Sequence, residues 1–199
     1  MDQAAKFMGV DYGSKLAGTT AAAYLVNGQI QVSQSQRGQD ADDWLWQLVN
    51  SVQPKVVYLD APLSLPKVYA KGVFTSTEEY FYRACDREVQ AMSPMFIGGL
   101  TARAIRLRAK LGEAGIAVLE TYPSQLAKQL FPNQTTYKKS SAAVSEFSEK
   151  LQSLLPFPVQ QPAANWHQFD SLLAWYSGYR HSQGQAILYG DATEGRIII

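Results

Sequence analysis

The stretch that decides the fold is residues 7–35, FMGVDYGSKLAGTTAAAYLVNGQIQVSQS. Three short apolar runs lie in it, and Asn27-Gly28 separates the second run from the third. An Asn-Gly pair between two such runs is the strongest short-range signal for a β-hairpin. The segment therefore predicts three strands in an antiparallel meander, the first of which ends at Asp11.

Helical and strand patterns alternate after this meander. An amphipathic helix is predicted over residues 43–52 and a buried strand over residues 55–60. A further strand over residues 116–120 and a long final helix capped by Asn165 follow. A meander followed by strand–helix units gives an α/β protein, in which helices flank a mixed sheet.

The length of 199 residues and a hydrophobic share of 46% predict a single globular domain over residues 7–199. Residues 1–6 are expected to be a loose tail, and residues 61–100 an insertion-like loop and helix. No signal peptide pattern is visible, and no apolar stretch reaches the ~18–20 residues that cross a membrane. The only cysteine is Cys85. These features predict a cytoplasmic protein with no membrane partner.

The net charge of +1 excludes a protein that is strongly basic over its whole length. Basic residues nevertheless gather between positions 83 and 110, a segment that contains six of them and two acids. The candidate substrate-binding residues in this segment are Arg83, Arg87, Arg103, Arg106 and Lys110. Such residues can follow a nucleic-acid backbone. A solvated helix face, or an internal ion-pair network of Arg83 and Arg87 with Asp86 and Glu88, explains them equally simply.

Three of the predicted strands finish on a carboxylate, at Asp11, Asp60 and Glu120. Ligands bind at the carboxyl ends of strands in open α/β sheets, so these acids are candidates to converge. Asp170 lies one turn into the final helix and is the fourth candidate. His167, three residues before it, is a candidate auxiliary residue that orients a carboxylate or moves a proton. Each acid alone is also a common turn or cap residue.

Four carboxylates at one sheet edge would repel each other unless they bound cations or shared protons. Ligand sets made only of oxygen suit Mg²⁺ or Mn²⁺. Two such ions, about 3.5–4 Å apart, can activate water and stabilise the leaving oxygen of a phosphodiester. The predicted metal and catalytic residues of a nuclease are therefore Asp11, Asp60, Glu120 and Asp170.

Five short motifs occur here in the order found in one known family. They are Gly9-Val10-Asp11, Leu59-Asp60-Ala61-Pro62, RACDRE at 83–88, Glu120-Thr121-Tyr122-Pro123 and HQFDSLLA at 167–174. Together they resemble an uncharacterised family of predicted nucleases with a ribonuclease-H-like fold, distantly related to the Holliday-junction resolvases. The resemblance implies a five-stranded mixed sheet of order 3-2-1-4-5, with strands one and four side by side. It also implies that Asp11, Asp60 and Asp170 hold the metals, with Glu120 beside them, and that DNA or RNA is the substrate.

Two alternatives remain open. Asp11-Tyr12-Gly13-Ser14 resembles the phosphate-binding hairpin of the actin, hexokinase and sugar-kinase group, in which Gly13 and Ser14 would face nucleotide phosphates. Those proteins need two such lobes, and 199 residues hold only one. The other alternative is a catalytically inactive binding module, which the presence of all four acids disfavours. The sequence does not define an oligomeric state.

Overall fold

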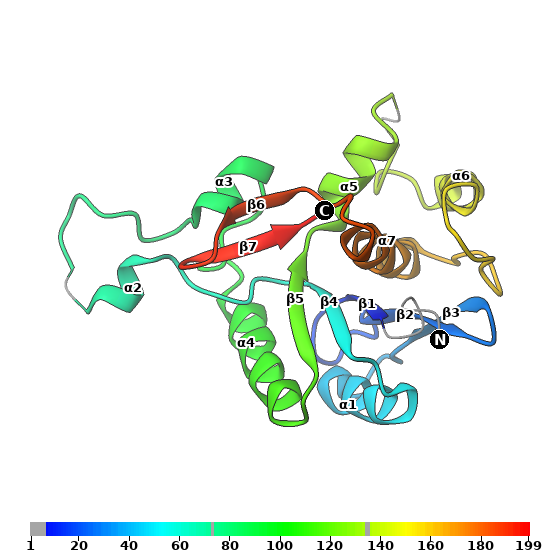
Figure 1. Cartoon of the computed structure of the whole chain (residues 1–199), viewed down its shortest axis with the longest axis horizontal. Coiled ribbons are helices and arrows are strands. Elements are labelled where there is room, and N and C mark those ends of the chain that lie inside the picture. The colour runs from blue at the N-terminus through cyan, green and yellow to red at the C-terminus, as the bar shows by residue number, and fades with distance from the viewer. Residues whose placement is uncertain (1–6, 73, 134–135) are drawn as a thin grey trace.

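The computed structural model of the chain describes residues 7–72, 74–133 and 136–199 (Figure 1). The expected loose tail, residues 1–6, lies outside the described residues. One mixed sheet of seven strands runs through the molecule in the order β3-β2-β1-β4-β5-β7-β6, with helices on both of its faces. The predicted α/β class with a mixed, helix-flanked sheet is confirmed. The expected number of five strands was wrong, because the C-terminal tail adds two.

The first three strands form the predicted meander. β1 (Phe7–Asp11) pairs antiparallel with β2 (Ala21–Val26), which pairs antiparallel with β3 (Gln29–Gln34). Asn27 and Gly28 make the turn between β2 and β3 with φ angles of 50° and 77°. Positive φ at both turn positions is the backbone form that an Asn-Gly pair favours, which explains why this hairpin could be predicted.

A parallel half of the sheet continues from β1. β4 (Val56–Asp60) pairs with β1, and β5 (Ala117–Thr121) pairs with β4, both in parallel. α1 (Ala41–Val52) begins at Asp40, whose carboxylate accepts hydrogen bonds from the next turn's backbone, and it leads into β4. α4 (Gly98–Glu113) leads into β5. Both helices cover the same face of the sheet (Figure 1).

The opposite face carries α7 (Trp166–Ser182), with α5 (Pro123–Leu130) and α6 (Val144–Gln152) beside it (Figure 1). α7 lies directly against β1 and β2. Gly9 makes this approach possible, because a Cβ atom there would lie 2.0 Å from the backbone nitrogen of Trp175. The glycine in the middle of β1 thus brings the final helix against the strand that ends at Asp11.

The sheet separates two hydrophobic cores. Alternate residues of a strand point to opposite faces, so each strand contributes to both cores. The core under α1 and α4 includes Met8, Val10, Leu59, Leu45 and Leu107. The core under α7 includes Phe7, Tyr58, Phe169, Leu173 and Trp175. Asp11 and Asp60 share their strand faces with Phe7 and Tyr58, and these faces lie on the side of the sheet that α7 covers.

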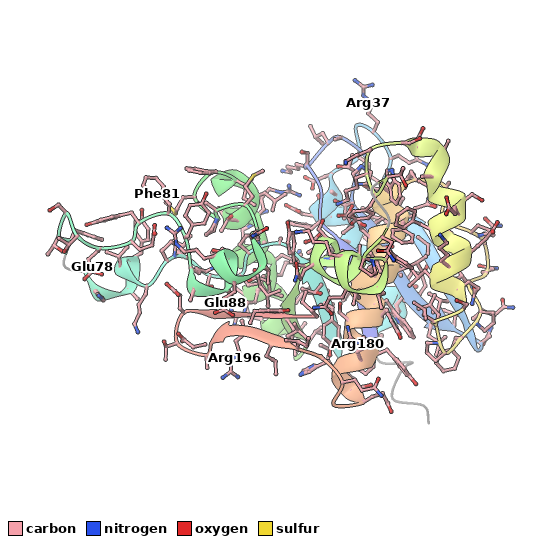
Figure 2. The ribbon with its side chains drawn as sticks, turned by 90° about the horizontal axis from the view of Figure 1, so that it is seen from above. Arg37, Glu78, Phe81, Glu88, Arg180 and Arg196 are labelled. Carbon is pink, nitrogen blue, oxygen red and sulfur yellow. The ribbon has the colours of Figure 1, made fainter. Side chains whose placement is uncertain are left out.

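The chain between β4 and α4 projects away from the sheet (Figure 1). It contains two short helices, α2 (Val68–Lys71) and α3 (Ala84–Val89), where the sequence predicted an insertion-like loop and helix over residues 61–100. Figure 2 shows Glu78 and Phe81 on this projecting segment, away from the sheet. Within the described ranges, no helix has both the length and the apolar character needed to cross a bilayer.

The C-terminal tail forms a hairpin of β6 (Leu188–Asp191) and β7 (Gly195–Ile198). β7 joins the sheet through β5, with Glu120 opposite Ile197 and Thr121 opposite Ile198. A short 3-10 helix, η2 (Ser141–Ala143), precedes α6. The tail supplies both strands that extend the sheet beyond β5.

Candidate metal centre

Asp11, Asp60 and Asp170 come together where β1 and β4 end. One carboxylate oxygen from each lies within 4.8 Å of the other two. Asp11 and Asp60 are register partners in the parallel β1–β4 pair, which places their side chains on the same face of the sheet. Asp170 comes from α7, which packs on that face beside Gly9. The structure thus brings together three of the four acids that the sequence predicted.

The Asp170 carboxylate is almost completely buried, with 1% of the residue exposed. The Tyr137 hydroxyl donates to its Oδ1 at 2.6 Å, and the Lys138 Nζ lies 2.5 Å from its Oδ2. The Lys138 contact lacks hydrogen-bond geometry, so Oδ2 has no hydrogen-bond donor among the described residues. Burial raises the pKa of Asp170 to about 6, although Lys138 opposes the rise.

The other two carboxylates differ in their partners. Asp11 Oδ2 lies 2.7 Å from His167 Nδ1, and this hydrogen bond raises the pKa of His167. None of the described residues donates a hydrogen bond to the carboxylate of Asp60. Burial raises the pKa of Asp60 well above its usual value, and the neighbouring Asp11 carboxylate raises it further. The predicted proximity of His167 to the acids is confirmed, and the cluster as a whole is short of positive charge.

These residues fit a divalent cation. All of the candidate ligand atoms are carboxylate oxygens, which suit hard ions such as Mg²⁺ and Mn²⁺. A buried carboxylate oxygen without a hydrogen-bond donor is costly unless a cation or a proton satisfies it. The Lys138 ammonium group lies 2.5 Å from Asp170 Oδ2, whereas the Asp60 carboxylate has no such partner among the described residues. The carboxylates of Asp11 and Asp60 line a cavity of about 300 Å³, through which an ion and a substrate can reach them.

Glu120 does not belong to the cluster. The β4–β5 register pairs it with Leu59, so its side chain lies on the face of the sheet opposite to Asp60. Its carboxylate pairs with Arg83, at 2.6 Å and 2.7 Å, and accepts a hydrogen bond from the Leu63 backbone at 2.9 Å. The expectation that four acids converge is therefore corrected to three. Glu120 still borders the cavity, next to the cluster.

Arg83 is buried in the same network and has no exposed surface. Its guanidinium donates to both carboxylate oxygens of Asp86, to both of Glu120 and to Ser64 Oγ. The structure thus favours the internal ion-pair interpretation of Arg83 over contact with a substrate. Cys85, next to it, is also buried, and burial raises the pKa of its thiol to about 12. A nucleophilic thiolate is not favoured there.

Arg103 is occupied by contacts within the protein. It donates to both carboxylate oxygens of Asp42, at 2.6 Å and 3.1 Å, and to the Gly13 carbonyl at 3.0 Å. Its guanidinium also lies 4.7 Å from the centre of the Tyr12 ring. These contacts tie the loop after β1 to α1 and α4. A role of Arg103 in holding this loop is thereby better supported than a free contact with phosphate.

The remaining basic candidates are more accessible. Arg106 and Lys110 line a groove between α1 and α4 together with Arg103. The Arg106 side chain is 74% exposed, and Lys110 lies over the ring of Trp46. Arg87 forms an exposed ion pair with Glu79. Contact of these residues with nucleic acid stays a prediction.

The Gly13 amide in the loop after β1 is already occupied. The Gly13 backbone nitrogen donates to Thr20 Oγ1 at 3.1 Å, and its carbonyl accepts from Arg103. A Cβ atom on Gly13 would lie 2.1 Å from Thr19 Oγ1. The glycine is therefore explained by close packing within the loop, which weakens the resemblance to a nucleotide-phosphate hairpin.

Sequence reasoning missed Tyr137 and Lys138. Both lie in the irregular segment between α5 and α6, where neither hydrophobic periodicity nor motif spacing marks a residue. Only the folded arrangement shows that they reach Asp170. No model of a known protein family matches the chain, and the curated proteins provide no match either.

Proposed function

We propose that the protein is a metal-dependent phosphodiesterase that cleaves DNA or RNA, with Mg²⁺ or Mn²⁺ held by Asp11, Asp60 and Asp170. One observation carries the proposal: three carboxylates from β1, β4 and α7 offer oxygens within 4.8 Å of one another. Like charges this close raise the free energy of the folded protein unless a cation or protons neutralise them. A divalent ion bound among them supplies the positive charge, and carboxylate oxygens are the ligands that Mg²⁺ and Mn²⁺ prefer.

A bound ion of this kind would polarise a phosphoryl oxygen and make water a stronger acid and thus a nucleophile at neutral pH. The chain's own residues fix the ligands for it. His167 holds Asp11, while Tyr137 and Lys138 hold Asp170. Two of the three carboxylates are thus oriented before a cation binds, which lowers the reorganisation that binding requires.

The cavity beside the carboxylates has a chemistry that suits a nucleotide. Asp11, Asp60 and Lys138 supply its polar side, and apolar side chains such as Met92 and Leu100 supply the other. A phosphodiester and its base need these two environments next to each other. Arg106 is a well-exposed cation in the groove between α1 and α4, where it is available to a longer nucleic-acid strand.

The strand order supports a ribonuclease-H-like fold for the same protein. Five neighbouring strands follow the order β3-β2-β1-β4-β5, which is the order that the sequence resemblance implies. We infer that β7 and β6 are an addition at the edge of this core. The assignment supplies a fold in which acids at these positions bind metal, although fold alone does not define a substrate.

The decisive experiment is the substitution Asp11→Asn, assayed by Mn²⁺-dependent cleavage of single-stranded, duplex and branched DNA and RNA. The amide keeps the shape of the side chain and removes the charge that holds the cation. We expect at least a thousandfold loss of cleavage with an unchanged or slightly higher melting temperature, because one source of repulsion is removed. Asp43→Asn is the matched control, since Asp43 is an exposed acid on α1 and outside the cluster.

Full cleavage by the Asp11→Asn protein, or cleavage that persists in EDTA, would contradict the proposal. If Asp11→Asn unfolds the protein because it loses the contact with His167, Asp60→Asn tests the same point without that contact. The ATP-binding alternative predicts a rise in melting temperature with an ATP analogue. Because the Gly13 amide already donates to Thr20, we expect no such rise. An inactive binding module would bind Mn²⁺ and cleave none of the substrates.

A further inference from the structure

Lys138 places an ammonium group inside the carboxylate cluster. Its Nζ lies 2.5 Å from Asp170 Oδ2, and its side chain lines the cavity that also contains Asp11 and Asp60. This ion pair places a positive charge directly beside one of the three acids.

The backbone around Lys138 is anchored where it stands. Lys138 has a φ of 58°, a left-handed conformation that is unfavourable for a lysine and persists only when its surroundings hold it. Tyr137 provides that anchor. Its ring packs edge-on against Trp166 at 5.1 Å and lies near Phe147 and Phe169, and its hydroxyl donates to Asp170. The lysine is thus directed into the cluster by a packed neighbour.

The charges of the site leave room for one divalent ion. The three carboxylates carry at most three negative charges, Lys138 cancels one of them, and His167 lies against Asp11. A single divalent ion is enough to neutralise the charge that remains. A second divalent ion would add two uncompensated positive charges next to the ammonium group, and like charges at such distances are strongly unfavourable in a partly buried site.

We propose that Lys138 is the second cation of this site: its ammonium group stands beside Asp170 in place of a second divalent ion, and the three acids bind one divalent ion. This inference rests on the proposed metal centre and replaces the two ions expected from the sequence. Lys138 is a positioning residue in this arrangement. It fixes Asp170 and keeps a positive charge at the cavity, where a phosphate oxygen of the substrate would arrive.

The test is the number of Mn²⁺ ions bound per chain, measured by calorimetric titration and by the electron paramagnetic resonance signal of free Mn²⁺. We expect one ion in the native protein and one in Lys138→Arg, which keeps the charge. We expect two ions in Lys138→Met, which removes the charge while keeping the apolar stem. Lys139→Met is the matched control and should bind one ion, because Lys139 is the exposed neighbouring lysine.

Two Mn²⁺ ions in the native protein would overturn the inference and leave the metal centre standing. One ion in both the native protein and Lys138→Met would also overturn it, because the charge of Lys138 would then not decide the stoichiometry. No bound Mn²⁺ in any variant would reject the proposed function together with the inference. Melting curves verify folding, and Lys138→Gln, for which two ions are expected, replaces the Met variant if that variant does not fold.

Discussion

Two groups of buried acids lie near the ends of β4 and β5, and they are built in opposite ways. In one group Arg83 donates to both oxygens of Asp86 and both of Glu120. In the other group, Asp11, Asp60 and Asp170 face one another. Asp170 has Tyr137 and Lys138 as partners, whereas the Asp60 carboxylate has no hydrogen-bond donor among the residues that the structure describes.

This difference separates a structural use of acids from a functional one. Burial alone does not distinguish the groups, because Glu120 and Asp170 are almost equally hidden from solvent. The supply of donors does. A carboxylate whose oxygens are all paired has no capacity left for a ligand, whereas a carboxylate facing other carboxylates needs a cation. The comparison explains why only three of the four acids are candidate metal ligands.

The largest expected effect comes from removing the shared donor of the paired group. Arg83→Met leaves the carboxylates of Asp86 and Glu120 buried without their partner, and breaking a buried ion pair in this way costs about 3–5 kcal/mol. For a chain of this size we expect a fall in melting temperature of roughly 6–20 °C. Thermal and chemical unfolding curves measure it.

Arg87→Met is the control for this substitution, since its ion pair with Glu79 is exposed. Exposed pairs contribute less than about 1 kcal/mol, so this variant should melt within a few degrees of the native protein. Equal melting temperatures for the Arg83 and Arg87 variants would show that the buried network does not stabilise the fold as the comparison requires.

The next effect is a pH dependence that belongs to the unpaired group. Burial raises the pKa of Asp170 to about 6, above the ordinary aspartate value, so the folded protein binds this proton more tightly than the unfolded chain does. The stability that results is present below about pH 4 and is lost as the pH rises through about 6. Asp60 has a raised pKa too and acts in the same direction.

We therefore expect the metal-free protein to lose on the order of 1–3 kcal/mol of stability between pH 4 and pH 7.5. Mn²⁺ should reverse most of the loss, because it neutralises the carboxylates that repel one another. Unfolding curves over this pH range in EDTA and in Mn²⁺ provide the measurement. Asp170→Asn should flatten the dependence. A metal-free protein that becomes more stable over the same range would refute this description of the cluster.

The sequence predicted the unpaired group well because local rules determine its parts. Asp11 ends the first strand of a meander, Asp60 ends an apolar strand, and Asp170 follows the helix cap at Asn165. Glu120 fits the same rule and was still misplaced. Its face depends on the β4–β5 register, in which it pairs with Leu59, one position short of Asp60. A shift of one residue turns a side chain to the other face, and strand composition does not define such a shift.

The contact of Lys138 with Asp170 could not be predicted from the sequence, for a different reason. Its segment has no period, and its position follows from the packing of Tyr137 against aromatic rings of α6 and α7. Contacts between distant segments of this kind are a property of the folded chain. The same holds for one of the two acid partners of Arg83: Asp86, three positions away, was predicted, whereas Glu120 lies 37 positions away in the sequence.

The smallest expected effect concerns the exposed basic side chains of α4, which lie outside both groups of acids. Arg103 donates a hydrogen bond to Asp42 at 2.6 Å. The side chain of Arg106 lies farther from the same carboxylate, at 3.6 Å, and is 74% exposed. If Arg106 contacts one phosphate, Arg106→Ala should lower the slope of log affinity against log salt by about 0.9 on duplex DNA, with an unchanged melting temperature. Arg103→Ala should instead lower the melting temperature, because it releases the loop after β1. Fluorescence anisotropy with labelled DNA in Ca²⁺, at several salt concentrations, separates the two. An unchanged slope for Arg106→Ala would assign this face to solvent and would place the path of the substrate elsewhere.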